Sequence, residues 1–180
     1  TIRNPYKMSL ELIIGPMFSG KTTELIRRCR RLKAVGKKVL IINHKNDNRN
    51  GIHSVSTHDG VKLTAKSVDM VTVHWFDTFK DDYDVIAIDE GQFFNGLRDV
   101  VIALKKLGKA VIISGLQGDS VMKPWKTITE LIPLADDIIQ TKALCVRCHA
   151  PAAFTRRLQP GGNQIDVGGK EKYMACCCLL

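Results

Sequence analysis

The sequence predicts an α/β fold in which a mostly parallel sheet is flanked by helices and carries a phosphate-binding loop (P-loop). Short apolar runs alternate with helical segments, a pattern typical of parallel sheets covered on both faces. The residues from Gly15 to Thr22, GPMFSGKT, fit the pattern G-x-x-x-x-G-K-[ST]. After Gln140 the chain becomes rich in cysteine, glycine and basic residues. We therefore expect a nucleotide-binding domain over residues 1–140 and a small second domain over residues 141–180.

The spacing of the glycine-rich loop follows from what a phosphate group requires. Gly15 and Gly20 allow the backbone to point successive N–H groups at a phosphate. Lys21 supplies a positive charge for the outer phosphates, and Thr22 supplies a hydroxyl for the accompanying Mg²⁺. The helix that follows adds the positive end of its dipole. We assign the whole loop to nucleotide binding: Gly15, Pro16, Met17, Phe18, Ser19, Gly20, Lys21 and Thr22.

The periodicity of apolar residues places the elements along the chain. Strands are expected at residues 10–14, 38–42, 85–88, 110–114 and 137–140, and helices from Thr23 onward and at residues 75–79, 97–107 and 125–131. The apolar faces of the first and third helices would carry Leu25, Cys29, Leu32, Leu97, Val101, Leu104 and Leu107. Residues 43–59 are polar and are expected to form a long loop. Because ligands bind at the carboxyl ends of parallel strands, Gly15, Asp89 and Gly115 should converge.

Two adjacent carboxylates, Asp89 and Glu90, follow the apolar strand expected at residues 85–88. Neighbouring side chains on a strand point to opposite faces unless the backbone turns. We expect Asp89 to face the metal beside the phosphate loop, and Glu90 to accept a proton from an attacking nucleophile. That nucleophile is water in a hydrolase and a substrate hydroxyl in a kinase, and these motifs fit both.

Five of the six cysteines lie in the last quarter of the chain, a distribution that favours a metal site over disulfides in a cytosolic enzyme. Cys145 and Cys148 form a C-x-x-C pair, which is half of many tetrahedral zinc sites. A further ligand would come from residues 176–178, and the candidates for the fourth position are Cys176, Cys178 and His149. Redox use of the C-x-x-C pair is the alternative.

Composition limits the classes of partner. The chain of 180 residues has a formal net charge of +9, which suits an anionic ligand or nucleic acid. Part of the excess lies along the first helix, where aromatic residues for base stacking are sparse, so we favour a solvated or interface surface over nucleic-acid binding. Apolar runs stay well below the ~18 residues of a membrane span, and the start of the chain shows no secretory signal. We expect a cytoplasmic protein that does not bind membranes.

Four segments together are similar to one enzyme family: GPMFSGKTTEL, IDEGQFF, the C-x-x-C pair and VGGKEKY. They resemble the thymidine kinases of vertebrates, poxviruses and many bacteria, over residues 11–177. The segments NDNR at residues 46–49 and THD at residues 57–59 match two further motifs of that family. The resemblance implies a RecA-like P-loop domain, a C-terminal zinc-ribbon and lasso domain, and ATP- and Mg²⁺-dependent phosphorylation of thymidine, with deoxyuridine also accepted. It further implies structural Zn²⁺, a homotetramer and feedback inhibition by thymidine triphosphate (dTTP).

The resemblance also implies roles for individual residues. Glu90 corresponds to the general base of the family, and Asp89 to its magnesium-associated aspartate. Further contacts with the nucleotide would come from Asp47, Arg49 and Gln92. The nucleoside pocket would comprise Met17, Phe93, Leu116, Trp125, Thr155, Gln164, Ile165, Asp166, Val167 and Tyr173, the last five on a lasso that closes over the base. The matching zinc ligands are Cys145, Cys148 and Cys177.

The chain departs from the family pattern at two places. Where the family has L-D-G-[TD]-F, residues 116–120 read LQGDS, so Ser120 replaces a ring, while Trp125 stands where Phe is usual. This exchange predicts a filled pocket of different shape. Where C-R-x-C is expected, residues 177–180 read CCLL, so Leu180 falls at the position of the fourth zinc ligand. We therefore expect Zn²⁺ to bind less tightly than in relatives.

Two other functions are compatible with the phosphate-loop motif. A nucleic-acid ATPase would use Glu90 to activate water, and the net charge and a zinc ribbon would suit it. The chain is short, however, for a motor with its own DNA surface, and its glycine-bearing tail suits closure over a small ligand. A scaffold stabilised by nucleotide is opposed by the presence of Lys21, Thr22, Asp89 and Glu90. The sequence favours a thymidine kinase.

Overall fold

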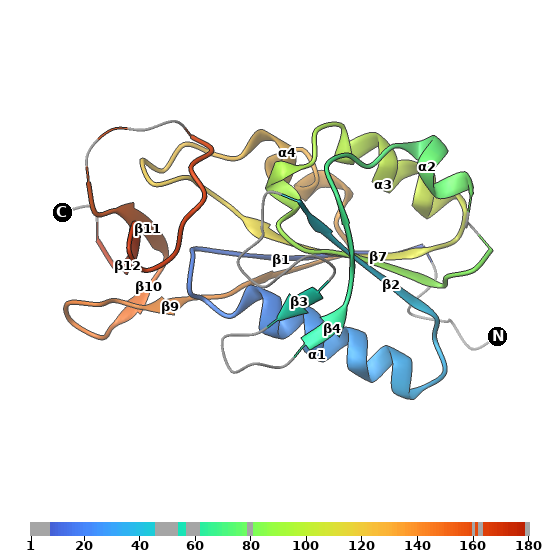
Figure 1. The fold of residues 1–180 in the computed structure, drawn as a ribbon, viewed down its shortest axis with the longest axis horizontal. Helices are drawn as coiled ribbons and strands as arrows, with labels where there is room; N and C mark the ends of the chain where they lie inside the picture. The colour runs from blue at the N-terminus through green and yellow to red at the C-terminus, as the bar shows by residue number, and fades with distance from the viewer. Residues whose placement is uncertain are drawn as a thin grey trace.

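The computed structural model describes residues 8–45, 54–56, 62–78, 81–159, 161 and 164–178. Its centre is a six-stranded sheet with the strand order β5-β2-β6-β7-β1-β8, in which every neighbouring pair is parallel (Figure 1). The strands are β1 (Leu10–Gly15), β2 (Val39–His44), β5 (Lys66–Val68), β6 (Val85–Ile88), β7 (Ala110–Leu116) and β8 (Asp137–Gln140). The predicted α/β class with a mostly parallel sheet is confirmed.

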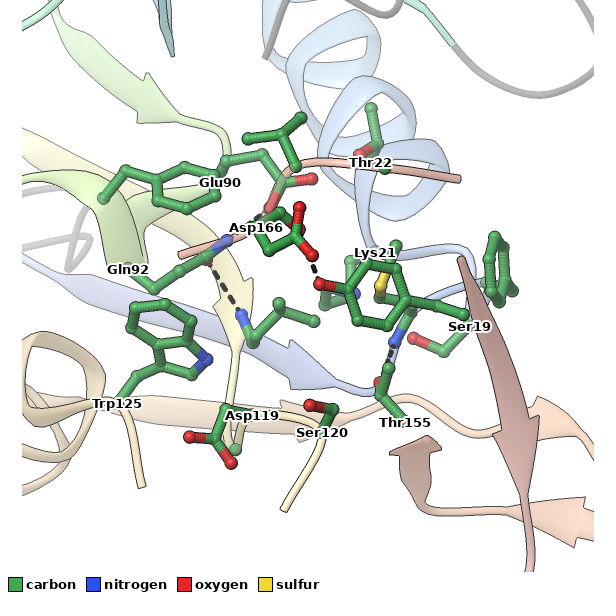
Figure 2. Close-up of a pocket in the computed structure, with 18 of the residues that line it drawn as sticks. Ser19, Lys21, Thr22, Glu90, Gln92, Asp119, Ser120, Trp125, Thr155 and Asp166 are labelled. Atoms are coloured by element: carbon green, nitrogen blue, oxygen red, sulfur yellow. Dashed lines mark hydrogen bonds between the residues drawn. The ribbon is translucent and has the colours of Figure 1, made fainter. Parts of the chain in front are cut away.

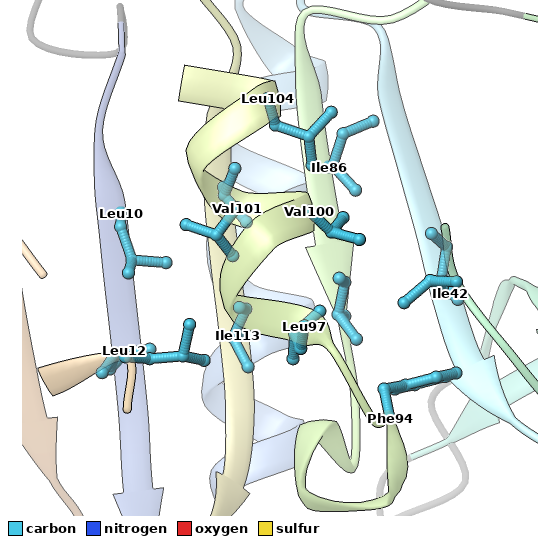
Figure 3. Close-up of a cluster of buried hydrophobic side chains, with 14 of the residues drawn as sticks. Leu10, Leu12, Ile42, Ile86, Phe94, Leu97, Val100, Val101, Leu104 and Ile113 are labelled. Carbon is cyan, nitrogen blue, oxygen red and sulfur yellow. The ribbon is translucent and has the colours of Figure 1, made fainter. Parts of the chain in front are cut away.

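Helices cover both faces of this sheet, as Figure 1 shows. The helix α1 (Lys21–Ala34) packs on one face, and α2 (Val73–Asp77), α3 (Leu97–Lys106) and α4 (Lys126–Thr129) pack on the other. Side chains alternate between the two faces along each strand. Ile41 therefore packs with the buried face of α1, whereas Ile42 belongs to the cluster around α3. In Figure 3, Leu97, Val101 and Leu104 project from α3 toward the sheet.

The predicted helices and strands differ from the structure mainly at their ends. The helix expected at residues 97–107 ends at Lys106, so Leu107 leaves the apolar face and is 43% exposed, against the prediction. The helix expected at residues 125–131 is a short α4 followed by the 3₁₀ helix η2 (Ile132–Leu134). The helix expected at residues 75–79 begins earlier, at Val73, and Phe79 lies outside the described residues.

The long loop expected at residues 43–59 contains regular structure. Asn43 and His44 complete β2, and β3 (Ser54–Ser56) pairs antiparallel with β4 (Lys62–Thr64). The strand β5 was also not predicted. These strands are three residues long and carry polar residues, so they lack the apolar run that identifies a buried strand.

The part of the chain after β8 forms two antiparallel strand pairs beside one end of the sheet (Figure 1). They are β9 (Ala143–Leu144) with β10 (Pro151–Ala152), and β11 (Phe154–Arg157) with β12 (Tyr173–Cys176). A small cluster of buried residues that includes Ala152 and Ala175 forms their core, and Phe18 packs against it. Because Phe18 follows β1, this second part lies against the carboxyl edge of the sheet. Within the described part of the chain, no helix has the length and apolar character needed to cross a membrane.

Ion pairs attach α1 to β1. Arg28 lies between Glu11 of β1 and Glu24 of α1, and its Nε donates to Glu24 Oε1 over 2.8 Å. Arg27 Nε donates to the other oxygen of Glu24 over 2.6 Å. The hydrogen bond from Arg27, followed by that from Arg28, lowers the pKa of Glu24 from 4.5 to about 2, although partial burial opposes this shift.

The lowered pKa of Glu24 predicts a pH-dependent contribution to stability. A carboxyl whose pKa is lower in the folded state stabilises the fold above its unfolded pKa, and the contribution is lost as the pH falls from 4.5 toward 2. We expect Glu24→Gln to lower the free energy of unfolding at pH 7 by about 1 kcal/mol, because these ion pairs are partly exposed. Urea denaturation from pH 7 to pH 3 should show this difference shrinking below pH 4.5.

Glu130→Gln, directly after α4, is the matched control, because the Glu130 carboxylate lies 3.6 Å from Lys126 and should contribute less. A difference between the native chain and Glu24→Gln that stays constant with pH would contradict the assignment.

Candidate active site

The loop between β1 and α1 is shaped by its own hydrogen bonds. Ser19 Oγ donates to the carbonyl of Pro16 over 2.8 Å, and Lys21 Nζ donates to the same carbonyl over 2.6 Å. Gly20 has a φ of 79°, a conformation that glycine adopts without steric cost. The loop ends at the N-terminus of α1, where the first backbone N–H groups have no partner within the helix. These N–H groups and Lys21 form a site that suits an anion.

The second part of the chain is hydrogen-bonded to this loop. The backbone N–H of Met17 donates to Thr155 Oγ1 over 2.8 Å, and the hydroxyls of Ser19 and Thr141 lie 2.7 Å apart. A side chain at Gly15 would collide with Thr141, so glycine permits this close approach. The loop and the chain around Thr141 and Thr155 thus form one continuous wall.

Asp89 lies directly after β6, next to the first turn of α1. Its carboxylate accepts a hydrogen bond from Thr22 Oγ1 over 3.0 Å, and Ser114 Oγ donates to its other oxygen. The register of the sheet explains the contact with Ser114. Ile88 of β6 is opposite Ile113 of β7, so the residues that follow them, Asp89 and Ser114, are also neighbours. The predicted convergence at the carboxyl ends of β1, β6 and β7 is present.

The backbone turns between Asp89 and Glu90. Glu90 has a φ of 52°, in the left-handed region that costs a residue other than glycine about 1–2 kcal/mol. The turn directs its side chain into a cavity, where Gln92 Nε2 donates to Glu90 Oε2 over 2.6 Å. The side-chain oxygen of Gln92, Oε1, in turn accepts a hydrogen bond from the backbone N–H of Leu116 over 3.0 Å. The two adjacent carboxylates therefore have separate surroundings, and the Glu90 carboxylate is held by an amide.

A cavity of about 170 Å³ lies between the loop, Glu90 and the second part of the chain (Figure 2). In Figure 2, Lys21 and Thr22 lie at one end, and Trp125 and Asp119 lie at the other. Phe93 and Trp125 make an edge-to-face contact with ring centroids 6.0 Å apart. The lining contains sixteen residues that the sequence predicted: Met17, Phe18, Ser19, Gly20, Lys21, Thr22, Glu90, Gln92, Phe93, Leu116, Trp125, Thr155, Gln164, Asp166, Val167 and Tyr173.

Residues near the C-terminus close one side of the cavity. The hydroxyl of Tyr173 donates to the backbone carbonyl of Asp166 over 2.5 Å. The carboxylate of Asp166 lies 2.7 Å from Lys172 Nζ and 3.5 Å from an Arg157 nitrogen. The hydrogen bond from Lys172 lowers the pKa of Asp166, so this carboxyl stays charged and paired. These contacts hold the segment that carries Asp166 beside β11 and β12.

Some predicted site residues do not line the cavity. Gly15, Pro16 and Asp89 lie behind the wall of the cavity, where Gly15 contacts Thr141 and Asp89 contacts Thr22. Ile165 was predicted to contact the substrate, but its side chain is 52% exposed and is absent from the lining. Asp47 and Arg49 lie outside the described residues.

Other residues belong to the site although the sequence did not assign them to it. Ser114 contacts Asp89, and the lining also includes Thr23, Gly118, Asp119 and Gly168. Ser120, at which the sequence predicted a change in pocket shape, lines the cavity as well. The carboxylate of Asp119 accepts the N–H groups of Val121 and Lys123, both over 2.9 Å, and so fixes the turn that carries Ser120. The available signal for Ser114 was its position as a polar residue at the end of an apolar run.

Three cysteines form a group that can hold a metal. The sulfur atoms of Cys145, Cys148 and Cys177 all lie within 4.8 Å of one another, and those of Cys148 and Cys177 are 3.4 Å apart. Ligands of a tetrahedral Zn²⁺, with Zn–S of about 2.3 Å, are separated by roughly 3.7 Å, so the donor set fits zinc. Backbone N–H groups, first that of Cys148, lower the pKa of the Cys145 thiol to about 6. Among the described residues, the other candidates, Cys176, Cys178 and His149, do not join this group.

The arrangement combines the chemical parts of a phosphoryl-transfer site. An anion-binding loop and the Glu90 carboxylate line one cavity, and a hydroxyl–carboxylate pair suited to Mg²⁺, Thr22 with Asp89, lies at its wall. Mg²⁺ prefers oxygen ligands, and Thr22 and Asp89 offer two of them side by side. The aromatic and apolar residues at the other end suit the ring of a small organic substrate.

Comparisons with known proteins agree with this chemistry. A family model described as "Thymidine kinase" matches residues 8–179. The chain is 37% identical over 172 residues to the thymidine kinase of fowlpox virus (strain NVSL), with 94% of each chain covered. It is 40% identical over 184 residues to that of Acanthamoeba polyphaga mimivirus, which covers 96% of this chain and 82% of the relative. It is 38% identical over 170 residues to that of monkeypox virus, with 93% of each chain covered.

The family model and these relatives extend over almost the whole chain, including both strand pairs that follow the sheet. The chain therefore belongs to the thymidine kinase family.

Proposed function

We propose that the chain transfers the γ-phosphoryl group of ATP to the 5′-hydroxyl of thymidine, and that deoxyuridine is also accepted. One observation carries this proposal: a single cavity joins Lys21 and Glu90 to the segment that holds Asp166 and Tyr173. A nucleoside bound beside that segment has room to present its hydroxyl to a phosphate held at Lys21. Family membership supports the same reaction.

The phosphate end of the site would be formed by the P-loop of a RecA-like domain over residues 1–140. The backbone N–H groups of the loop and the Lys21 ammonium would bind the phosphates, and most of the catalysis in phosphoryl transfer comes from such positioning and charge neutralisation. Thr22 and Asp89 would hold Mg²⁺, which neutralises charge on the phosphates when bound. Asp47 and Arg49 would complete this end of the site.

Glu90 would act as the general base. Its carboxylate faces the cavity, accepts a hydrogen bond from Gln92 and would accept the proton of the 5′-hydroxyl. The oxygen of the nucleoside then bonds to the γ-phosphorus as the bond from that phosphorus to the β-γ bridging oxygen breaks. Closure of the segment at residues 164–173 over a bound nucleoside would exclude bulk water, which favours transfer to the nucleoside over hydrolysis.

The nucleoside end would be formed by residues from both parts of the chain. Phe93, Leu116 and Trp125 supply apolar surface from the sheet side, and Tyr173 supplies a ring from β12. The segment at residues 164–173 would close over the base as a lasso, with the hydrogen bond between Tyr173 and Asp166 fixing its turn. We propose residues 141–180 as a domain that combines this lasso with a zinc ribbon.

We predict that Glu90→Gln lowers kcat by about a hundredfold or more, which is the range for loss of a general base, while affinity for ATP is retained. Steady-state kinetics with thymidine, combined with calorimetric titration of ATP, would separate the two effects. Glu130→Gln, which removes a carboxylate directly after α4 and away from the cavity lining, is the control and should leave both unchanged. Near-normal turnover of Glu90→Gln would remove Glu90 from this role.

We also propose that Cys145, Cys148 and Cys177 bind a structural Zn²⁺, less tightly than in relatives because Leu180 stands at the fourth position. Metal analysis of freshly purified protein should find about one Zn²⁺ per chain, since one tetrahedral site is available. Cys148→Ser should lower this content and the thermal stability together, whereas Cys29→Ala, a buried cysteine on α1, should retain the metal. Absence of zinc from the native protein would contradict the proposal, as would full zinc content in Cys148→Ser.

Membership of the family also supports three proposals about the whole molecule. We propose a homotetramer, a cytoplasmic location and feedback inhibition by dTTP, which would bind across the phosphate and nucleoside ends of the same cavity.

A further inference from the structure

A serine outside the assigned site residues contacts the proposed metal-binding carboxylate. The side chain of Ser114 is fully buried, and its hydroxyl donates a hydrogen bond to Asp89 Oδ1. Asp89 itself is 3% exposed. Buried polar groups of this kind keep their hydrogen-bond partners because an unpaired one is costly. The contact is thus a fixed part of the surroundings of Asp89.

The backbones of Ser114 and Asp89 are constrained to different degrees. β7 continues through Ser114 to Leu116, so the backbone at Ser114 is fixed by the ladder of the sheet. β6 ends at Ile88, one residue before Asp89, and the backbone turns at Glu90. Ser114 therefore belongs to a rigid element, whereas Asp89 lies in a turn that follows one.

Thr22, which also donates a hydrogen bond to Asp89, cannot hold the Asp89 carboxylate in the same way throughout the reaction. Thr22 Oγ1 lies 3.0 Å from Asp89 Oδ2, and Thr22 is itself a proposed ligand of Mg²⁺. When its oxygen binds a cation, the geometry of its hydrogen bond to Asp89 changes. Thr22 Oγ1 lies nearer to Oδ2 than to Oδ1, at 3.0 Å against 3.3 Å, whereas Ser114 donates to Oδ1 from outside the cavity lining. The hydrogen bond from Ser114 can therefore persist with and without the metal.

We propose that Ser114 is a positioning residue, which fixes the rotation of the Asp89 carboxylate so that one oxygen stays directed toward Thr22 and the bound Mg²⁺. This inference rests on the proposed function, because it requires that Asp89 serves the metal. Residues that orient a metal ligand through a hydrogen bond change metal affinity when they are removed, typically by about tenfold to a hundredfold.

The test measures metal binding directly rather than activity. Mn²⁺ replaces Mg²⁺, and its affinity for the complex of the protein with a non-hydrolysable ATP analogue is measured by electron paramagnetic resonance. Ser114→Ala removes the hydroxyl, and Ser114→Cys replaces it with a weak donor of similar size. Both should weaken Mn²⁺ binding by about tenfold. Affinity for the analogue without metal should be unchanged.

Two control variants separate positioning from packing. Ser114→Thr keeps the hydroxyl and should retain Mn²⁺ affinity within about threefold. Ile113→Val changes the packing of the neighbouring buried position and should also leave the affinity unchanged. The inference is overturned if Ser114→Ala and Ser114→Cys bind Mn²⁺ as tightly as Ile113→Val does, or if Ser114→Thr loses as much affinity as Ser114→Ala.

Asp89→Asn distinguishes failure of this inference from failure of the proposed metal role. If Asp89→Asn weakens Mn²⁺ binding and Ser114→Ala does not, Asp89 serves the metal and the inference about Ser114 is wrong. If Asp89→Asn also binds Mn²⁺ normally, the metal role of Asp89 fails, and the inference about Ser114 fails with it.

Discussion

The carboxylate of Asp89 accepts hydrogen bonds from two elements that reach it from different directions, the first turn of α1 and the strand β7. Both contacts depend on the parallel sheet, which aligns the ends of β1, β6 and β7 at one edge. The loop after β1 and the turn after β6 are short and are fixed by their own hydrogen bonds. A shift of one residue in the register of β6 against β7 would separate Asp89 from Ser114. The relative positions of the site residues therefore depend on the register of the sheet.

The second part of the chain completes the site. Thr155 and Thr141 are hydrogen-bonded to the loop after β1, and Phe18 packs into the small core of the second part. The cysteine group lies in this same part, so a bound metal would stabilise the strands that carry one wall of the cavity. The proposed zinc site and the proposed nucleoside site are thus linked through the same strands, although their chemistry is separate.

Much of the fold was predictable because buried parallel strands leave a strong signal. The apolar runs of β1, β2, β6 and β7 identified those strands, and family motifs pointed to most of the lining of the cavity. Strands such as β5 were missed because they are short and polar. The left-handed backbone at Glu90 and the contact between Ser114 and Asp89 depend on tertiary geometry. The exposure of the Ile165 side chain could not be foreseen, because a loop has no periodicity from which to predict which side chains face inward.

The proposed reaction requires one cavity that holds both the phosphates of ATP and a pyrimidine nucleoside. The most direct measurement is phosphoryl transfer from ATP and Mg²⁺ to thymidine, deoxyuridine, deoxycytidine and deoxyguanosine, with a control that lacks nucleoside. We expect phosphorylation of thymidine and deoxyuridine, and little ATP consumption in the control. Transfer to the other bases as well would keep the kinase and assign a broader selectivity to Ser120 and Trp125. Consumption of ATP without any phosphorylated nucleoside would contradict the account.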